Sequence, residues 1–340
     1  MAIKLFTPFV SEEAIENTVR VLKSGYLAEG DEVKQFEYEF ADKFRVQNVV
    51  ALNSGTSALE LAYELAGIGE GDEVITPVLT CTATNLPLVR RKARIVFADI
   101  DHDLNVSVED IKRKLTANTK AIVFVHFGGN NRGLKELLSL GVPVIEDAAQ
   151  AVGSDYWGRG DLTAISLQAI KTLTSGDGGF LIVKDNDLYH KARRLRWFGY
   201  DRDLKHELGD TDITEAGYKY HMNNISAAIG RGNLEHADRL IAHRKALGAI
   251  YEQYGLFAHV WLAGGLTDDY RGLQAHAKER GVEIGQHHYR NDTYTIFKEY
   301  KTHCPVMDEL ENRYYFVPLH HLVTMEQAHL IGTLCQNWQS

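Results

Sequence analysis

The sequence predicts an α/β protein with a mostly parallel central sheet flanked by helices, followed by a smaller C-terminal α+β unit. Two observations lead to this prediction. In the first half of the chain, short apolar runs rich in Val, Ile and Phe alternate with helix-like segments. Such alternation requires crossover connections, which produce parallel strands covered on both faces. After Lys171 the alternation gives way to one long helical pattern and then to shorter mixed segments.

The expected strands of the sheet are short and lie between helix-like stretches. They fall at residues 48–53, 72–77, 93–100, 120–127 and 142–149. The helix after the first strand is marked by apolar residues that recur at helical spacing, namely Leu59, Ala62, Tyr63 and Ala66. Two further strand-like runs flank Lys171 within the stretch ISLQAIKTLTSGDGGFLIV, residues 165–183.

The second half of the chain is expected to hold a long helix and a small domain. The helical pattern spans about residues 223–254, with a break expected near Gly230–Gly232. Further helices are expected at about 267–280 and 324–337. We place a boundary near residue 240, which divides the chain into a large domain, 1–240, and a small C-terminal domain, 241–340.

Composition excludes several classes of partner. The net charge is -9 and no basic block is present, which argues against nucleic acid and anionic membranes. The three cysteines contain no CxxC pair, so we expect neither disulfides nor a metal site, and a reducing cytoplasmic location fits best. No secretory signal is seen at the N-terminus, and no run approaches the length of a membrane span.

The stretch NSGTSAL, residues 53–59, leads from a strand into a helix. Its free backbone N–H groups, the hydroxyls of Thr56 and Ser57 and the helix dipole would together make a seat for a phosphate. The alternative is a plain helix N-cap formed by Ser54 or Thr56. This stretch alone favours neither interpretation.

A second stretch, VIEDAAQAVG, places Glu146 and Asp147 at the end of an apolar strand. A carboxylate at a sheet edge is well placed to pair with a cationic ring nitrogen or to bind a metal. Equally, the two carboxylates could simply cap the strand end in solvent. Gln150 would offer an amide to the same pocket if the chain turns into a helix there.

Lys171 lies beside a glycine-rich loop that contains Gly176, Gly178 and Gly179. A lysine in a partly desolvated cleft has a lowered pKa and attacks carbonyls, whereas an ordinary surface lysine is solvated. Ser166, five residues earlier, could donate to a phosphate. A phosphate seat, an acid for a ring nitrogen and a carbonyl-reactive lysine are the parts that a pyridoxal-phosphate site requires.

Taken in order, the motifs resemble those of the sugar-nucleotide aminotransferases of the DegT/DnrJ/EryC/StrS group, which are fold type I pyridoxal-phosphate enzymes. The motifs ALNSGTSALELA, DEVITPVLTCTATNLPLV, ARIVFADID, VIEDAAQAVG and SLQAIKTLTSGDGGFL follow in family order and spacing. VPLHHLVTMEQ, residues 317–327, resembles the family's closing motif. The resemblance implies pyridoxal 5'-phosphate as cofactor and transamination as activity.

The resemblance also implies a role for each candidate residue. Lys171 would form the Schiff base and later carry the proton between substrate and cofactor. Asp147 would keep the pyridine nitrogen protonated, and Gln150 would lie near the ring's phenolic oxygen. The phosphate would be held by the backbone at Gly55 and by the hydroxyls of Thr56, Ser57 and Ser166.

Family members are dimers in which a neighbour's segment completes each active site, so an isologous homodimer is expected. The corresponding segment here is GYKYHMNN, residues 217–224, which would bring Lys219 to a phosphate. From its residues alone, the segment reads equally well as a helix start capped by Asn223. His221 stands where the family has arginine, which changes this contact.

A second departure is Cys81, at a position where the family usually stacks an aromatic side chain on the cofactor ring. A thiol cannot stack and gives only a small, polarizable contact. We therefore expect weaker retention of the cofactor, or compensation by another residue.

The leading hypothesis is a cytoplasmic aminotransferase that moves the amino group of L-glutamate to a nucleotide-linked keto-deoxysugar. A 4-keto-6-deoxy sugar is the first choice, on family frequency alone. His287, His288 and His320 would line the sugar side, although structural roles are also compatible with the sequence. Two alternatives stay open: a keto-cyclitol or aminoshikimate-type aminotransferase or synthase, and a non-catalytic relative that binds sugar nucleotides.

Overall fold

The computed structural model describes residues 2–209 and 211–339, and its centre is a seven-stranded sheet. The strand order is β1-β8-β7-β6-β5-β2-β4. Neighbours from β7 to β4 pair in parallel, and β8 is inserted antiparallel between β7 and β1. The strand bounds are β1 Val49–Leu52, β2 Glu73–Pro77, β4 Arg94–Ala98, β5 Thr119–Val125, β6 Val144–Asp147, β7 Leu162–Ser166 and β8 Gly179–Val183. The mostly parallel sheet predicted from the sequence is confirmed.

Both faces of this sheet are buried. In β1, Val50 and Leu52 join one core cluster, whereas Val49 and Ala51 join another on the opposite face. Side chains alternate across a strand, so a strand covered on both faces is apolar at every position. This is why the strands read as continuous apolar runs in the sequence.

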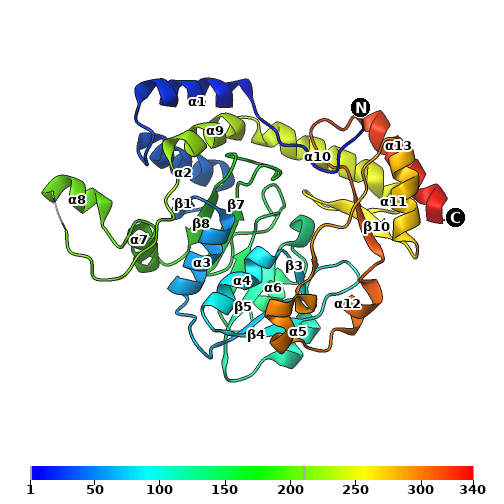
Figure 1. Ribbon diagram of the computed structural model, residues 1–340, viewed down its shortest axis with the longest axis horizontal. Helices are drawn as coiled ribbons and strands as arrows, with labels where there is room; N and C mark the ends of the chain where they lie inside the picture. The colour runs from blue at the N-terminus through cyan, green and yellow to red at the C-terminus, as the bar shows by residue number, and fades with distance from the viewer. Residues whose placement is uncertain (1, 210, 340) are drawn as a thin grey trace.

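Helices surround the sheet and carry its connections (Figure 1). The α-helices before the second unit are α1 Glu12–Ser24, α2 Asp31–Phe44, α3 Gly55–Leu65, α4 Thr82–Arg90, α5 Val108–Lys114, α6 Leu134–Leu137, α7 Asn186–Leu195, α8 Arg202–Leu208 and α9 Asn224–Leu234. α3 packs against β7 and β8, which brings its first turn to the strand ends. Among the described residues, no helix is long and apolar enough to cross a membrane.

The long helical pattern does break, but not at the glycines. It divides at Glu235 and His236 into α9 and α10, Ala237–Glu252. Gly230 and Gly232 lie inside α9. A Cβ on Gly230 would overlap the Phe36 ring, and a Cβ on Gly232 would overlap the backbone of Ala14. The prediction of a break at the glycines was therefore wrong, because they serve close packing of α9 against α1 and α2.

A second, smaller sheet lies toward the C-terminus, with order β12-β10-β9 and antiparallel pairing throughout. Its strands are β9 Phe257–Ala258, β10 Ala263–Leu266 and β12 Tyr314–Val317, and its helices are α11 Tyr270–Glu279 and α13 Met325–Gln339. α10 runs on from α9 and packs on β9, β10 and α13 (Figure 1). The proposed domain boundary near residue 240 falls inside α10.

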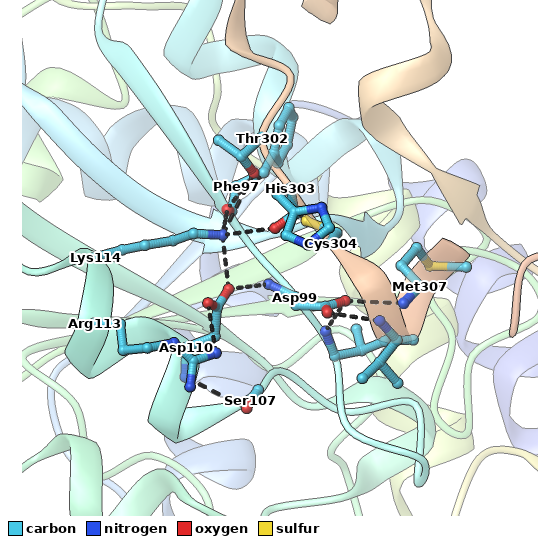
Figure 2. Close-up of polar contacts among 12 residues, drawn as sticks. Phe97, Asp99, Ser107, Asp110, Arg113, Lys114, Thr302, His303, Cys304 and Met307 are labelled. Carbon is cyan, nitrogen blue, oxygen red and sulfur yellow. Dashed lines mark hydrogen bonds and ion pairs between the residues drawn. The ribbon is translucent and has the colours of Figure 1, made fainter. Parts of the chain in front are cut away.

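The chain between these last elements returns to the large sheet. β11, Tyr289–Arg290, pairs with β3, Leu79–Thr80, and the short helix α12, Pro305–Leu310, docks beyond the end of β4. At that docking point the Asp99 carboxylate accepts the N–H groups of Val306 and Met307, each at 2.9 Å (Figure 2). Lys114 donates to the carbonyl of Phe97 and to Asp110 beside it, each at 2.7 Å. This return fixes the segment that precedes it, which contains His287 and His288.

Candidate active site

The candidate site lies where the carboxyl ends of several strands meet, as is usual for open α/β sheets. β6 ends at Asp147 and its neighbour β7 ends at Ser166, with Asp147 paired to Ala164 in the ladder. α3 begins directly after β1, and a Cβ on its first residue, Gly55, would lie 2.8 Å from Cβ of Ser166. The three motifs that the sequence singled out are therefore brought together.

Lys171 lies in the loop that joins β7 to β8. The loop is folded by backbone hydrogen bonds from Leu167 N to Gly178 O at 2.9 Å and from Ser175 N to Leu167 O at 3.0 Å. The left-handed φ of +81° at Gly176 permits its sharp turn. Burial lowers the pKa of Lys171 to about 8, although the negative charge of Asp147 opposes that shift.

Trp261 holds this lysine from the second unit and was not singled out from the sequence. The Lys171 Nζ lies 4.1 Å from the Trp261 ring centroid, and the indole N–H donates to the carbonyl of Ile170 at 3.3 Å. Phe6 stacks on the same indole with ring centroids 5.2 Å apart. Trp261 therefore contacts two successive residues of the lysine loop.

Asp147 is the buried acid of the site, with only 5% of its surface exposed. Its carboxylate accepts a hydrogen bond from the Thr84 hydroxyl at 2.7 Å and from the N–H of Ala149 at 3.2 Å. The Thr84 hydroxyl in turn lies 2.9 Å from that of Thr80. The two hydrogen bonds to its oxygens hold the Asp147 carboxylate in place at the end of β6.

The neighbouring carboxylate, Glu146, points to the other face of the sheet and does not join the site. It is fully buried and contacts Nε2 of His126 at 2.6 Å. It also accepts the N–H groups of Gly158 and Arg159, at 3.0 and 2.6 Å, which closes the β6–β7 connection. Only one of the two adjacent acids is therefore available for chemistry.

The start of α3 is the candidate seat for an anion. Its N-cap is Ser54, whose hydroxyl oxygen accepts the N–H of Ser57 at 3.0 Å. The N–H groups of Gly55 and Thr56, the first two of the helix, have no intrahelical acceptor by geometry. The Ser57 hydroxyl donates to Oδ1 of Asn53 at 2.6 Å, so its hydrogen is already engaged at the start of the helix. The N-cap interpretation is therefore confirmed, and the cap leaves the N–H groups of Gly55 and Thr56 available to an anion; the phosphate seat stays a prediction.

Cys81 lies at the N-cap of α4, close enough to Asp147 and Lys171 to interact with their charges. Burial raises the pKa of the Cys81 thiol, so the group is neutral at pH 7. It adds a small contact to the site rather than an aromatic wall. The aromatic ring nearest to Lys171 in the described contacts is that of Trp261.

Gln150 and the two adjacent histidines also belong to the site. Oε1 of Gln150 accepts the N–H of Gly128 at 2.6 Å, and its Nε2 lies 2.9 Å from Nε2 of His288. His287 lies 4.0 Å from His288 and 5.1 Å from Trp261, measured between ring centroids. Burial, and then the charge of Lys171, lower the pKa of His287 to about 4, so it is neutral at pH 7.

Two predicted residues lie apart from this group. Both ring nitrogens of His320 are engaged by backbone, Nε2 with Lys4 O at 2.8 Å and Nδ1 with the N–H of Leu322 at 3.3 Å. Lys219 has an exposed side chain, and its carbonyl accepts from Nδ2 of Asn53 at 3.3 Å. We leave His320 out of the proposed site and keep Lys219 as an outward-facing candidate.

His221, the other departure in that segment, is half-buried. Its ring lies 3.8 Å from that of Trp197 in an edge-on contact. Burial lowers the pKa of His221 to about 4, so it carries no charge at pH 7 where the family has a permanently charged arginine. A charged contact from position 221 is therefore excluded at neutral pH.

The donor set fits pyridoxal phosphate. The amine of Lys171 suits its aldehyde, the buried Asp147 suits its ring nitrogen, and the Gly55–Ser166 junction at the start of α3 suits its phosphate. A bound cofactor of this kind acts as an electron sink for the substrate's carbanion. Fold and site together define a pyridoxal-phosphate enzyme of the α/β class.

Comparison with known proteins gives the family. The chain matches the model of the DegT/DnrJ/EryC1/StrS aminotransferase family over residues 8–335 and belongs to that family. Aminotransferases of this family depend on pyridoxal phosphate, and this protein is such an enzyme. The family resemblance read from the sequence motifs is thereby confirmed.

Two relatives and one solved structure show what the chain is similar to. The chain is 36% identical over 260 residues to the spore coat polysaccharide biosynthesis protein SpsC of Bacillus subtilis, covering 72% of this chain and 67% of the relative. It is 31% identical over 336 residues to the GDP-perosamine synthase of Escherichia coli O157:H7, covering 91% and 90%. The crystal structure of the sugar aminotransferase CalS13 from Micromonospora echinospora superposes with a TM-score of 0.91 at 28% identity, covering 98% of this chain and 99% of CalS13.

The lowered pKa of Lys171 has a measurable consequence for cofactor capture. Only the neutral amine attacks a carbonyl, so the rate constant for binding pyridoxal phosphate should rise with pH and level off above about 8. Stopped-flow absorbance measures this rate from pH 6 to pH 10, which covers about two units on either side of the Lys171 pKa. A rate that kept rising to the top of that range would mean that Lys171 titrates like a solvated lysine.

Proposed function

We propose that this sugar aminotransferase moves the amino group of L-glutamate to a 4-keto-6-deoxy sugar carried on a nucleoside diphosphate. The observation that carries the proposal is the meeting of Lys171, Asp147 and the start of α3 at one edge of the sheet. Amino donor and keto acceptor would use the same site in turn, since one lysine serves both halves of a ping-pong reaction.

Each residue of the candidate site has one task in this scheme. The Lys171 amine accepts the proton from the substrate carbon and passes it to the cofactor. Asp147 holds a positive charge on the ring nitrogen, and Thr84 keeps that carboxylate in place. The start of α3 with Ser166 fixes the phosphate, which orients the reacting atoms toward Lys171. His287, neutral and close to the lysine, remains a candidate to face the sugar.

Similarity to the GDP-perosamine synthase over most of both chains makes guanosine diphosphate the first nucleotide to try. The test incubates the cofactor-loaded enzyme with L-glutamate and a panel of keto substrates, with mass spectrometry of the products. The panel holds GDP- and dTDP-linked 4-keto-6-deoxy sugars, a 3-keto isomer and a keto-cyclitol. Amination of a nucleotide-linked 4-keto sugar supports the proposal. Amination of the cyclitol alone, or no amination of any member by an enzyme that holds its cofactor, would contradict it.

We further propose an isologous homodimer, supported by an apolar row on the outer face of α1. Ile15, Val19 and Leu22 follow one another at helical spacing and are 47%, 42% and 52% exposed. Tyr26 extends the row at 61% exposure, and its carbonyl accepts from Asn224 at the end of the GYKYHMNN segment. The row is therefore continuous with the segment that would reach a partner's site. A second copy of the chain is the proposed occupant of this surface.

Leu22→Glu should convert the dimer to a monomer, because a carboxylate on this row would lose its hydration on association. Light scattering coupled to size-exclusion chromatography measures the mass. Leu330→Glu on α13, at 54% exposure, is the matched control and should stay dimeric. A wild-type protein of monomer mass, or a dimer that survives Leu22→Glu, would argue against this interface.

A further inference from the structure

The contact between Gln150 and His288 joins two residues that lie far apart in the sequence. The two Nε2 atoms are 2.9 Å apart, and 138 positions separate the residues in the chain. The other end of the Gln150 amide is occupied, because Oε1 accepts the N–H of Gly128 at 2.6 Å. Gln150 is 5% exposed, so water does not compete for its amide. The amide is thus held at both ends.

These two contacts fix which atoms donate. A carbonyl oxygen must face the Gly128 N–H, so the amide nitrogen of Gln150 faces His288 and donates to it. His288 must then present a lone pair at Nε2 and carry its proton on Nδ1. Burial, and then the neighbouring His287 and Lys171, hold the pKa of His288 well below its usual range, which keeps the ring neutral and able to accept.

His288 is itself fixed in place. Its carbonyl accepts the hydroxyl of Tyr314 at 2.9 Å, and its ring meets the Phe127 ring edge-on at 6.2 Å between centroids. Its φ of +66° lies in the left-handed region, which is uncommon outside glycine and needs surrounding contacts to persist. The backbone on both sides is held as well, because β11 begins at the next residue and pairs with β3.

We propose that His288 is a positioning residue that holds the Gln150 amide so that its second N–H serves the bound cofactor's phenolic oxygen. This inference rests on the proposed function, and it assigns to His288 a role through Gln150 rather than toward the sugar. An N–H donated to that oxygen stabilises its negative charge and so lowers the pKa of the lysine-bound cofactor. Loss of the His288 acceptor frees the amide to rotate, and that pKa then rises.

The test is an absorbance titration of the lysine-bound cofactor in four proteins: wild type, His288→Phe, Gln150→Leu and the double variant. His288→Phe keeps the ring shape and removes the acceptor, and it should raise the pKa by about one unit, the shift expected for one hydrogen bond to a charged oxygen. Gln150→Leu should raise it by at least as much. In the Gln150→Leu background, His288→Phe should then add nothing, because its effect passes through the missing amide.

A conservative variant and a direct measurement complete the design. His288→Asn keeps an acceptor oxygen and tolerates the left-handed φ, so it should recover part of the shift. Nitrogen-15 NMR of labelled histidine should find the His288 proton on Nδ1, a result that does not depend on catalysis. The NMR measurement also stands if His288→Phe does not fold.

Several outcomes would overturn the inference. One is an additive effect of His288→Phe in the Gln150→Leu background, which would point to a route through the neighbouring titratable groups Lys171, Asp147, Cys81 and His287. Another is a wild-type pKa in His288→Phe, and a third is a His288 proton found on Nε2. A wild-type protein that never forms the lysine-bound cofactor would instead refute the proposed function, and the tautomer measurement would still test His288.

Discussion

Lys171→Ala should abolish transamination and leave the protein folded. The side chain lies over the Trp261 ring, and no hydrogen bond or ion pair of its terminal amine is among the described contacts, so its loss removes chemistry rather than structure. Loss of both the nucleophile and the proton carrier should lower kcat by at least about 1,000-fold. The measurement is steady-state turnover of L-glutamate with the best keto acceptor, beside a thermal unfolding curve.

Two controls make this result specific. Lys92→Ala removes an exposed lysine whose ion-pair partner is Glu70, and it should turn over like the wild type. Added ethylamine should restore part of the lost rate in Lys171→Ala, because a small amine can replace the missing base in the vacated space. Turnover of Lys171→Ala within about tenfold of wild type would show that another group carries the proton.

Asp147→Asn should retain the fold and lose about 100- to 1,000-fold in kcat, the range expected when one charge is removed from a buried site. The amide preserves an oxygen for the Ala149 N–H and a partner for the Thr84 hydroxyl, so packing is largely kept. What disappears is the negative charge that would hold a proton on the ring nitrogen. Single-turnover absorbance with L-glutamate measures the affected half-reaction directly.

The same substitution has a second signature in the pH profile. The negative charge of Asp147 raises the pKa of Lys171, which burial has lowered to about 8. Removing that charge should lower the pKa of Lys171 further, so the cofactor-capture rate should level off at a lower pH in Asp147→Asn than in wild type. Thr84→Val, which removes only the hydroxyl that positions Asp147, should cost less than about tenfold and shift the profile little. A wild-type rate in Asp147→Asn would rule out its role at the ring nitrogen.

The local parts of the site could be predicted from the sequence because each of them lies within a few residues of a strand end. Asp147 and Ser166 close their strands and Gly55 opens α3, so strand periodicity alone places them at one edge of the sheet. Lys171 follows β7 by five residues and could also be placed. The residues alone did not separate Glu146 from Asp147, and the family resemblance chose Asp147. The sheet gives the physical reason, because adjacent residues of a strand face opposite sides.

The remote parts could not be predicted in this way. Trp261 and His288 reach the site from the second unit, at sequence distances that no local pattern encodes. The same holds for Thr84, which meets Asp147 across 63 positions. The break in the long helix was misplaced for a related reason: glycine reads as a helix breaker in sequence, whereas Gly230 and Gly232 are required by the neighbouring helices.

The return of the C-terminal segment to the large sheet explains how the two units share one site. Two contacts follow His287 and His288 in the chain: β11 pairs with β3, and α12 is held by Asp99. Together they fix the segment that carries the two histidines. The Gly128 carbonyl accepts the N–H of Trp261 at 2.9 Å, and its own N–H binds Gln150. Lys171, Trp261, Gln150 and His288 are thereby tied into one connected arrangement. The small thiol of Cys81 leaves Trp261 as the main aromatic contact of the lysine.

The central claim is that Lys171 carries transamination with pyridoxal phosphate and L-glutamate. The most direct measurement is the visible absorbance spectrum of the cofactor-loaded protein before and after L-glutamate is added, with Lys171→Ala alongside. The account predicts a band of lysine-bound cofactor that bleaches to the pyridoxamine form in the wild type and is absent from Lys171→Ala. A wild-type protein that shows no such band, or a band that is unchanged in Lys171→Ala, would contradict it.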